Sequence, residues 1–245
     1  MIQVHTSAGA WGLVSMSPFC TKLETYLRLK SIPYKPRGAA LTRAPKGKIP
    51  WVVFDDGREL GDSQLTLELL EREHPPALDG WLSDSQRATG RLVRRTLEEG
   101  VYFISMYQRW VYEPSWAVFA PAFAEAAQLP ARLRAFVMPL IRRKVRASLE
   151  AQGTGRHRRE EIWTMGIADI DAVAEQFVGP WFFGAKPSTV DATVFAFIDG
   201  IACFPVDTPL SLHVRQSRRW MDYCFFVKST VFADRQQPSS TALAG

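Results

Sequence analysis

The stretch Ser17-Pro18-Phe19-Cys20-Thr21-Lys22-Leu23-Glu24-Thr25-Tyr26-Leu27 decides the fold of the first part of this chain. Its second residue, a proline, suits the first turn of a helix, where an amide hydrogen would have no partner. Apolar residues then recur at helical spacing, and Ser31-Ile32-Pro33 ends the helix. The unpaired amides and the macrodipole at the start of this helix favour an anion beside Ser17.

Strand patterns surround this helix. A loop rich in small residues precedes it, and Asp55-Asp56-Gly57 supplies a hairpin turn whose residues tolerate positive φ. A helix with regularly placed leucines follows the hairpin and ends near His74-Pro75-Pro76. We interpret the order as β-α-β-α-β-β-α, which is that of a thioredoxin-like domain. The expected strands are residues 2–6, 34–37, 51–54 and 58–60.

Beyond a linker near residues 75–84, helical patterns dominate to about residue 231. We therefore predict an α/β thioredoxin-like domain at residues 1–76 and an all-α domain at residues 85–235. The last residues, 236–245, are small and polar, so we expect a disordered tail.

Composition limits the class of protein. The chain has 245 residues, of which 47% are hydrophobic, but no apolar run is long enough to span a membrane. It starts directly with a strand pattern, so we expect a cytoplasmic protein. The three cysteines are widely separated and have no partner at ligand spacing, so we expect neither a disulfide framework nor a metal site.

The net charge of +5 would attract anions of several kinds. Many of the basic residues lie between residues 132 and 159, which we interpret as solvated helix faces. Contact with anionic lipid or nucleic acid stays open, although the chain lacks RNA-binding signatures and we expect no dedicated nucleic-acid domain.

Two further short motifs complement the helix that begins after Ser17. Lys48-Ile49-Pro50 enters a strand, and a cis bond before Pro50 would turn the amide and carbonyl of Ile49 outward, where they can pair with a peptide. Asp62-Ser63-Gln64 opens a helix, with Ser63 expected at the N-cap to hold a carboxylate and Asp62 facing an ammonium. Glutathione carries a thiol, a peptide, and a carboxylate with an ammonium in that order, so the three motifs predict a glutathione site.

Each motif also has a structural interpretation. Ser17 is also explained as a simple N-cap, and Ser15 is its nearest rival as the functional hydroxyl. Lys48 is also explained as a solvated side chain, Pro50 as a loop terminator and Asp62-Ser63 as an ordinary cap. For Cys20 we favour a small, buried and protonated helix residue, because the first cysteine of a C-x-x-C motif is replaced by serine here.

The residues resemble the glutathione transferases over nearly the whole chain. The Ser17–Leu27 stretch, together with Ala44-Pro45-Lys46-Gly47-Lys48-Ile49-Pro50, looks most like the branch of the failed-axon-connections proteins and their bacterial relatives, which is related to the metaxins. Pro187-Ser188-Thr189-Val190-Asp191 is similar to the capping box of the buried helix in the transferase C-terminal domain. We assign that pair a structural role.

The resemblance implies roles for individual residues. Ser17 would donate a hydrogen bond to the glutathione sulfur and stabilise the thiolate, and Lys48 would reach a glutathione carboxylate. The first helix of the second domain usually flanks the sulfur, so its aromatic residues and Trp11 are candidates for an acceptor pocket, although such a stripe is more often core. A homodimer is also implied. The candidates for the pocket are Trp11, Tyr102, Met106, Tyr107 and Trp110.

Two classes of function remain. In the first, the protein is a serine-type glutathione transferase that activates the thiol of its co-substrate for attack on, or reduction of, a small hydrophobic electrophile. In the second, the fold is an interaction scaffold with weak or no catalysis. The presence of Ser17, Lys48, Ile49-Pro50 and Asp62-Ser63 together favours the enzyme.

Overall fold

The computed structural model describes residues 1–236. Its first part contains a four-stranded sheet in the order β2-β1-β3-β4. β1 pairs in parallel with β2 and antiparallel with β3, and β4 completes a hairpin with β3. The strands are β1 Ile2–His5, β2 Tyr34–Arg37, β3 Trp51–Val53 and β4 Glu59–Gly61.

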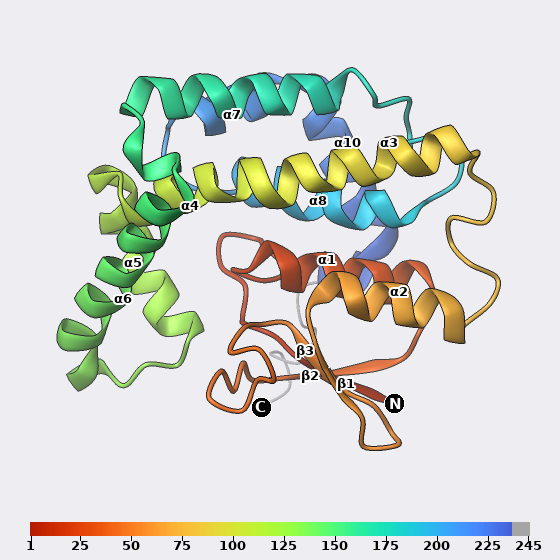
Figure 1. Ribbon diagram of the computed structural model, residues 1–245, viewed down its shortest axis with the longest axis horizontal. Coiled ribbons are helices and arrows are strands. Elements are labelled where there is room, and N and C mark those ends of the chain that lie inside the picture. Colours follow the sequence, from red (N-terminus) through yellow and green to blue (C-terminus); the bar gives the residue numbers. More distant parts are fainter. Residues whose placement is uncertain (237–245) are drawn as a thin grey trace, which may run out of the picture.

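Two helices, α1 (Pro18–Leu29) and α2 (Ser63–Glu73), cover one face of this sheet (Figure 1). Residues alternate between the two faces of a strand, so Ile2 and Val4 of β1 both point toward these helices. They pack in one apolar cluster with Leu23 of α1, and Leu67 of α2 belongs to the same cluster. The thioredoxin-like arrangement predicted from the sequence is confirmed.

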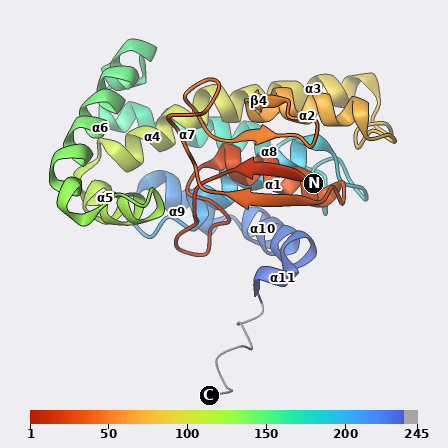
Figure 2. The same cartoon turned by 90° about the horizontal axis from the view of Figure 1, so that it is seen from below.

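One predicted element is wrong. The expected order has a helix between the second and third strands, but residues 38–50 form turns and bends instead. Pro45 and Gly47 interrupt this segment, and both residues disfavour a helix interior. The indole of Trp51 on β3 donates a hydrogen bond to the carbonyl of Ala39, 3.1 Å away, which connects the start of this segment to the sheet. Figure 2 shows this face of the sheet from below, without a helix across it.

The remainder of the described chain is helical. α3, the π-helical segment η1 and α4 follow one another without a break, and Figure 1 shows α3 and α8 in a layer between α1 and α7. The helices are α3 Asp84–Arg95, η1 Thr96–Val101, α4 Tyr102–Trp110, α5 Glu113–Ala126, α6 Ala131–Gln152, the short 3-10 helix η2 Thr154–Arg156, α7 Arg159–Ala174, α8 Thr189–Ala202, α9 Pro209–Gln216, α10 Arg218–Val231 and α11 Ala233–Gln236.

The central helix α8 is buried along its length, and its start is fixed by Asp191. This carboxylate accepts hydrogen bonds from the Ser188 amide (2.8 Å), the Ser188 hydroxyl (2.7 Å) and the Phe182 amide (2.7 Å). The hydroxyl of Tyr223 on α10 is a fourth donor, at 3.1 Å. The pair Ser188 and Asp191 is thus engaged in holding the helical core together.

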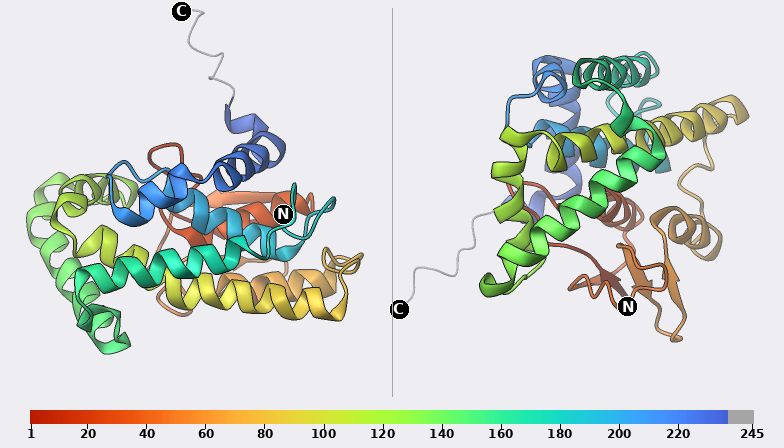
Figure 3. Two further views of the ribbon diagram at one scale, coloured as in Figure 1. Left: turned by 90° about the horizontal axis from the view of Figure 1, so that it is seen from above. Right: turned by 60° about the vertical axis from the view of Figure 1, so that its left-hand side comes forward.

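The last helices return to the first part of the chain (Figure 3). Arg28 of α1 bonds both carboxylate oxygens of Asp234 at 2.6 and 3.0 Å, and Arg235 reaches the buried Glu24 at 2.8 Å. The tail expected at 236–245 lies outside the described residues, apart from Gln236 at the end of α11. None of the helices within residues 1–236 combines the length and apolar character that a membrane crossing requires.

Candidate functional site

Ser17 stands directly before α1, where its carbonyl accepts the amides of Cys20 and Thr21 at 3.1 Å each. Its position is that of an N-cap, but its hydroxyl makes no capping hydrogen bond. A serine that serves only as a cap uses this hydroxyl to satisfy the first helical amides. The Ser17 hydroxyl is therefore not consumed by the start of the helix.

Ser15, the rival hydroxyl, is committed to the loop. It is buried, and its oxygen lies 2.7 Å from the Ser7 hydroxyl while accepting the Ser17 amide at 3.2 Å. These bonds hold the loop in the shape that presents Ser17. The geometry thus favours Ser17 over Ser15 as the group that can receive a ligand.

Cys20 lies one turn further into α1 and is fully buried. Burial raises the pKa of its thiol, and the hydroxyls of Thr6 and Ser17 only partly oppose that effect. A buried thiol with a raised pKa is protonated at neutral pH and is a poor nucleophile. The expected burial of Cys20 is confirmed, and the raised pKa of its thiol agrees with the protonated state expected from the sequence.

The second motif lies at the entrance to β3. The peptide bond between Ile49 and Pro50 is cis, as predicted. Within residues 1–236, neither the amide nor the carbonyl of Ile49 has a hydrogen-bond partner. The ammonium of Lys48 is exposed and likewise forms no ion pair in the described part of the chain. This segment therefore offers one donor and one acceptor of the main chain beside a cation.

The third motif differs from the prediction by one residue. The N-cap of α2 is Asp62, not Ser63, because the Asp62 carboxylate accepts the amides of Gln64 (2.9 Å) and Leu65 (3.1 Å). Ser63 is the first residue of the helix. It is buried, and its hydroxyl and amide have no partner among the described residues. The expected N-cap role of Ser63 is therefore wrong, although its polar groups are available.

The backbone of Asp62 is strained, with φ 102° and ψ 122°. A residue other than glycine rarely adopts positive φ, and such a conformation costs on the order of 1–3 kcal/mol. Strain of this kind concentrates at ligand sites, where it fixes the direction of neighbouring polar groups. Here the strained residue directly precedes Ser63, whose amide and hydroxyl have no partner in the described part of the chain.

A buried ion pair that the sequence analysis missed supports the start of α2. The ammonium of Lys22, fully buried in α1, donates to Glu98 of η1 at 2.5 Å and to the side-chain oxygen of Gln64 at 2.7 Å. The other oxygen of Glu98 accepts from Arg94 at 2.8 Å. Burial lowers the pKa of Lys22, and the charge of Glu98 opposes that shift. Helical spacing already places Lys22 on the buried face of α1, because it follows Phe19 by three residues and precedes Tyr26 by four.

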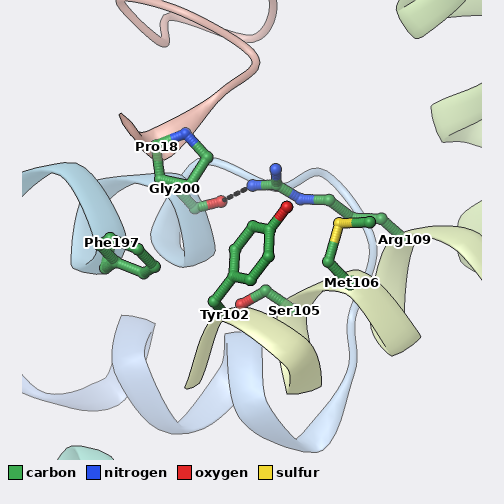
Figure 4. Close-up of a pocket in the computed structure, with 7 residues that line it drawn as sticks. All are labelled: Pro18, Tyr102, Ser105, Met106, Arg109, Phe197 and Gly200. Carbon is green, nitrogen blue, oxygen red and sulfur yellow. Dashed lines mark hydrogen bonds between the residues drawn. The ribbon is translucent and has the colours of Figure 1, made fainter. Parts of the chain in front are cut away.

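A small cavity adjoins the start of α1 (Figure 4). The space in it that is open to water is about 10 Å³, which is enough for about one water molecule. Two of the predicted acceptor residues, Tyr102 and Met106, line it together with the buried Arg109. The complete lining is Pro18, Tyr102, Ser105, Met106, Arg109, Phe197 and Gly200.

The other three aromatic candidates do not line this cavity. Trp11 packs edge-on against Phe204, with ring centroids 5.5 Å apart. Tyr107 contacts Trp163, and Trp110 belongs to a cluster of aromatic rings from α5. Arg109 is a lining residue that was not expected from the sequence, although its spacing from Tyr102 and Met106 is that of one helix face.

Comparison with known proteins agrees with this geometry. A family model described as the glutathione S-transferase N-terminal domain matches residues 18–115, and one described as the glutathione S-transferase C-terminal domain matches residues 166–225. Together the two matches cover more than half of the chain. This chain belongs to the glutathione S-transferase family.

Two curated relatives of this glutathione S-transferase family member are each 29% identical to it. One is the isoprene-epoxide–glutathione S-transferase of Rhodococcus sp. (strain AD45), aligned over 91% of this chain and 96% of the relative. The other is Failed axon connections of Drosophila melanogaster, aligned over 76% of this chain but only 46% of the relative. The predicted resemblance to the failed-axon-connections proteins is confirmed as a distant homology.

Solved structures confirm the fold of the glutathione S-transferase family. A glutathione transferase homologue from Sulfitobacter with bound glutathione has a TM-score of 0.57 and 14% identity, over 96% of this chain and 97% of that one. A glutathione S-transferase of Ceriporiopsis subvermispora in complex with glutathione also has a TM-score of 0.57. It is 18% identical, over 94% of this chain and 98% of that one.

Proposed function

We propose that this protein is a serine-type glutathione transferase. Glutathione would lie across the end of the sheet where β1 and β4 end and β3 begins, with its cysteine beside Ile49, its γ-glutamyl group at Asp62 and Ser63, and its sulfur at Ser17. The proposal rests on the main-chain groups of Ile49 and the hydroxyl and amide of Ser63, which have no partner in residues 1–236, and on the Ser17 hydroxyl, which caps no helical amide. Their order matches that of the chemical groups of glutathione. Lys48 supplies a cation for a carboxylate of the ligand.

Each end of the tripeptide has a physical reason for its place. The carboxylate of the γ-glutamyl group would bind the hydroxyl and amide of Ser63, where the start of α2 adds a favourable dipole. The ammonium would pair with the Asp62 carboxylate oxygen that the two helical amides leave unused. The buried pair of Lys22 and Glu98 would keep the start of α2 in position against α1.

The chemical step in this proposal is thiol activation. The Ser17 hydroxyl would donate to the sulfur, and the dipole of α1 would further stabilise the thiolate. A hydrogen bond to a charged acceptor contributes about 1.5–3 kcal/mol, which corresponds to a thiol pKa lower by about one to two units. The thiolate would then attack a small electrophile between the sheet domain and the helices. An epoxide, as in the name of the Rhodococcus relative, is one such electrophile.

The alternative is a scaffold that keeps the fold without the chemistry; the second curated relative, Failed axon connections, does not have the name of an enzyme. Calorimetric titration with glutathione, followed by a conjugation assay with 1-chloro-2,4-dinitrobenzene, separates the two. Binding with turnover supports the transferase. Binding without turnover of this or other electrophiles supports the scaffold, and absence of glutathione binding contradicts the proposed site.

Two further features of the proposal are expectations from the sequence, and only the first of them rests on the family resemblance. We propose a homodimer, in which the sheet domain of one subunit contacts the helical domain of the other, and a cytoplasmic location. Sedimentation equilibrium measures the first, and a monomer at all concentrations would contradict it. Fractionation of cells that express the protein tests the second.

A further inference from the structure

The outer face of α6 carries exposed apolar side chains that the fold does not use. Leu133 is 43% exposed, Leu140 66% and Phe136 75%. With about 3.6 residues per turn, these three side chains lie within an arc of about 60° around the helix. The opposite face of α6 packs into the core through Met138, which is buried, and Ile141, which is partly buried. α6 is therefore apolar on two faces, and the fold covers only one of them.

This outer face lies at the surface of the molecule. Figures 1 and 2 show α6 at one end of the structure, and in the right-hand view of Figure 3 it runs along the side that faces the viewer. The helix continues without a break through Pro139, so the three apolar residues belong to one element. Apolar side chains that gather in one exposed stripe indicate an interaction surface, whereas single exposed ones do not.

Cations flank the apolar stripe. Arg132, Arg143 and Lys144 are exposed, and none of them forms an ion pair with another residue in the part of the chain that the structure describes. Arg143 and Lys144 follow Leu140 by one helical turn and lie on the two sides of the stripe. From its first residue to residue 149, α6 contains no acidic side chain.

The pair of helices α5 and α6 also concentrates the charge of the protein. Residues 113–149 contain six arginines and lysines but only two acidic residues, which gives this segment a net charge of +4 against +5 for the whole chain. One of the two carboxylates, Glu113, is already paired with Arg142 at 2.7 Å. The outer face of α6 therefore attracts an anionic partner and repels a second copy of itself.

We propose that the outer face of α6 docks the protein on an anionic lipid surface. The helix lies in the plane of the membrane interface, with Leu133, Phe136 and Leu140 among the upper parts of the acyl chains. The flanking cations contact the headgroup phosphates, while their methylene stems remain beside the apolar stripe. Nucleic acid would use the cations but leave the two leucines in water, so lipid fits the surface better. Docking needs no glutathione, and the inference does not rest on the proposed transferase function.

Flotation of the full-length protein with lipid vesicles tests this docking. The wild type should bind mixed vesicles of phosphatidylglycerol and phosphatidylcholine, and bind at least about tenfold more weakly to phosphatidylcholine alone or at high salt. The double variant Phe136→Ser, Leu140→Ser should lower the partition coefficient for mixed vesicles by about tenfold or more, because it removes apolar area from the interface. The double variant Arg143→Gln, Lys144→Gln should lower it by about tenfold, since each cation near the surface contributes about fivefold.

Two control variants match these changes elsewhere on the surface. Phe225→Ser removes a ring that is 71% exposed from α10, which Figure 2 shows away from α6. The double variant Arg158→Gln, Arg159→Gln removes two adjacent arginines that pair with Glu161 and Glu160. Each control should change the partition coefficient by no more than about twofold, because the charges and rings it removes lie outside the docking face. All the replaced side chains are exposed, so circular dichroism should show wild-type folding in every variant.

No binding of the wild type to the mixed vesicles would overturn the proposal. Equal losses in the α6 variants and in the controls would also overturn it, because they would mean attraction by net charge alone. Self-association in sedimentation equilibrium that Phe136→Ser, Leu140→Ser abolishes, without vesicle binding, would assign the face to a second copy of the chain. Binding to duplex DNA without binding to vesicles would assign the cations to nucleic acid. The conjugation assay with glutathione is independent of all these outcomes.

Discussion

Removing Glu98 should strongly destabilise the protein, because it strands a buried charge. In Glu98→Ala, the fully buried ammonium of Lys22 keeps only the amide oxygen of Gln64, 2.7 Å away. Breaking a buried pair by removing one partner costs about 3–5 kcal/mol. That loss is a large fraction of the 5–15 kcal/mol by which folded domains are typically stable.

The contacts of Lys22 and Glu98 also predict which of the two residues contributes more to stability. In Lys22→Met, Glu98 keeps its bond to Arg94 at 2.8 Å, so no charge is left without a partner. Lys22→Met should therefore cost less than Glu98→Ala. Glu99→Ala is the control, since Glu99 forms the same kind of i,i+4 pair with Arg95 but in solvent. Its loss should change the free energy of unfolding by less than about 1 kcal/mol.

The loss in Glu98→Ala should depend on pH with a definite sign. Burial already lowers the pKa of Lys22 in the folded state, and removing the carboxylate lowers it further. Between the folded pKa and the unfolded value of about 10.4, the unfolded chain binds more protons, so stability rises with pH. The deficit of Glu98→Ala should therefore shrink between pH 7 and about pH 10.

Urea unfolding of the wild type and of the three variants, at neutral and at alkaline pH, measures these differences. Because Gln64 follows Ser63 directly, Glu98→Ala should also weaken glutathione binding under conditions where the protein is still folded. A cost below about 1 kcal/mol, or a deficit that grows with pH, would refute the account of Lys22 as a charged, buried partner of Glu98.

Four other substitutions test neighbouring parts of the structure. Cys20→Ala should cost about 1 kcal/mol of stability and leave conjugation nearly unchanged, whereas Ser17→Cys should create thiol-transferase activity. If the wild type reduces disulfides and Cys20→Ala abolishes that activity, both expectations are contradicted. Asp191→Ala should lower the free energy of unfolding by about 1–3 kcal/mol for each buried donor that it leaves unpaired, and a loss near zero in urea unfolding would exclude that role. Ser63→Ala should weaken glutathione binding in calorimetry more than it lowers kcat, and wild-type affinity would displace the γ-glutamyl group from Ser63.

Much of the fold followed from local chemistry. Spacing alone predicted three features that depend on residues within about one turn of helix. They are the proline after Ser17, the apolar stripe of α1, and the capping pair of Ser188 and Asp191. The errors came where local signals compete. Asp62 and Ser63 are both good N-caps, and Asp62 is the cap because its carboxylate accepts two helical amides, whereas Ser63 already belongs to the helix. The helix expected between β2 and β3 was carried over from the fold order, although Pro45 and Gly47 oppose it.

The candidate site was only partly predictable. Its polar motifs are contiguous in sequence, whereas the partners of Lys22 and Arg109 lie far away along the chain, at Glu98 and Gly200. Helical spacing shows that a charged residue faces the core but not which group it meets there. The hydrogen bond from Arg109 on α4 to the carbonyl of Gly200 on α8 brings Arg109 to the cavity, whereas Trp11 packs against Phe204 and does not line it.

The most direct test of the central claim, that Ser17 activates the glutathione thiol, is the pKa of that thiol when glutathione is bound. Titration of the thiolate's ultraviolet absorbance in the complex gives this pKa for wild type and for Ser17→Ala. The account predicts a wild-type value below that of free glutathione and a rise of about one to two units in Ser17→Ala, with the affinity for glutathione largely retained. An identical thiol pKa in the two proteins would contradict it.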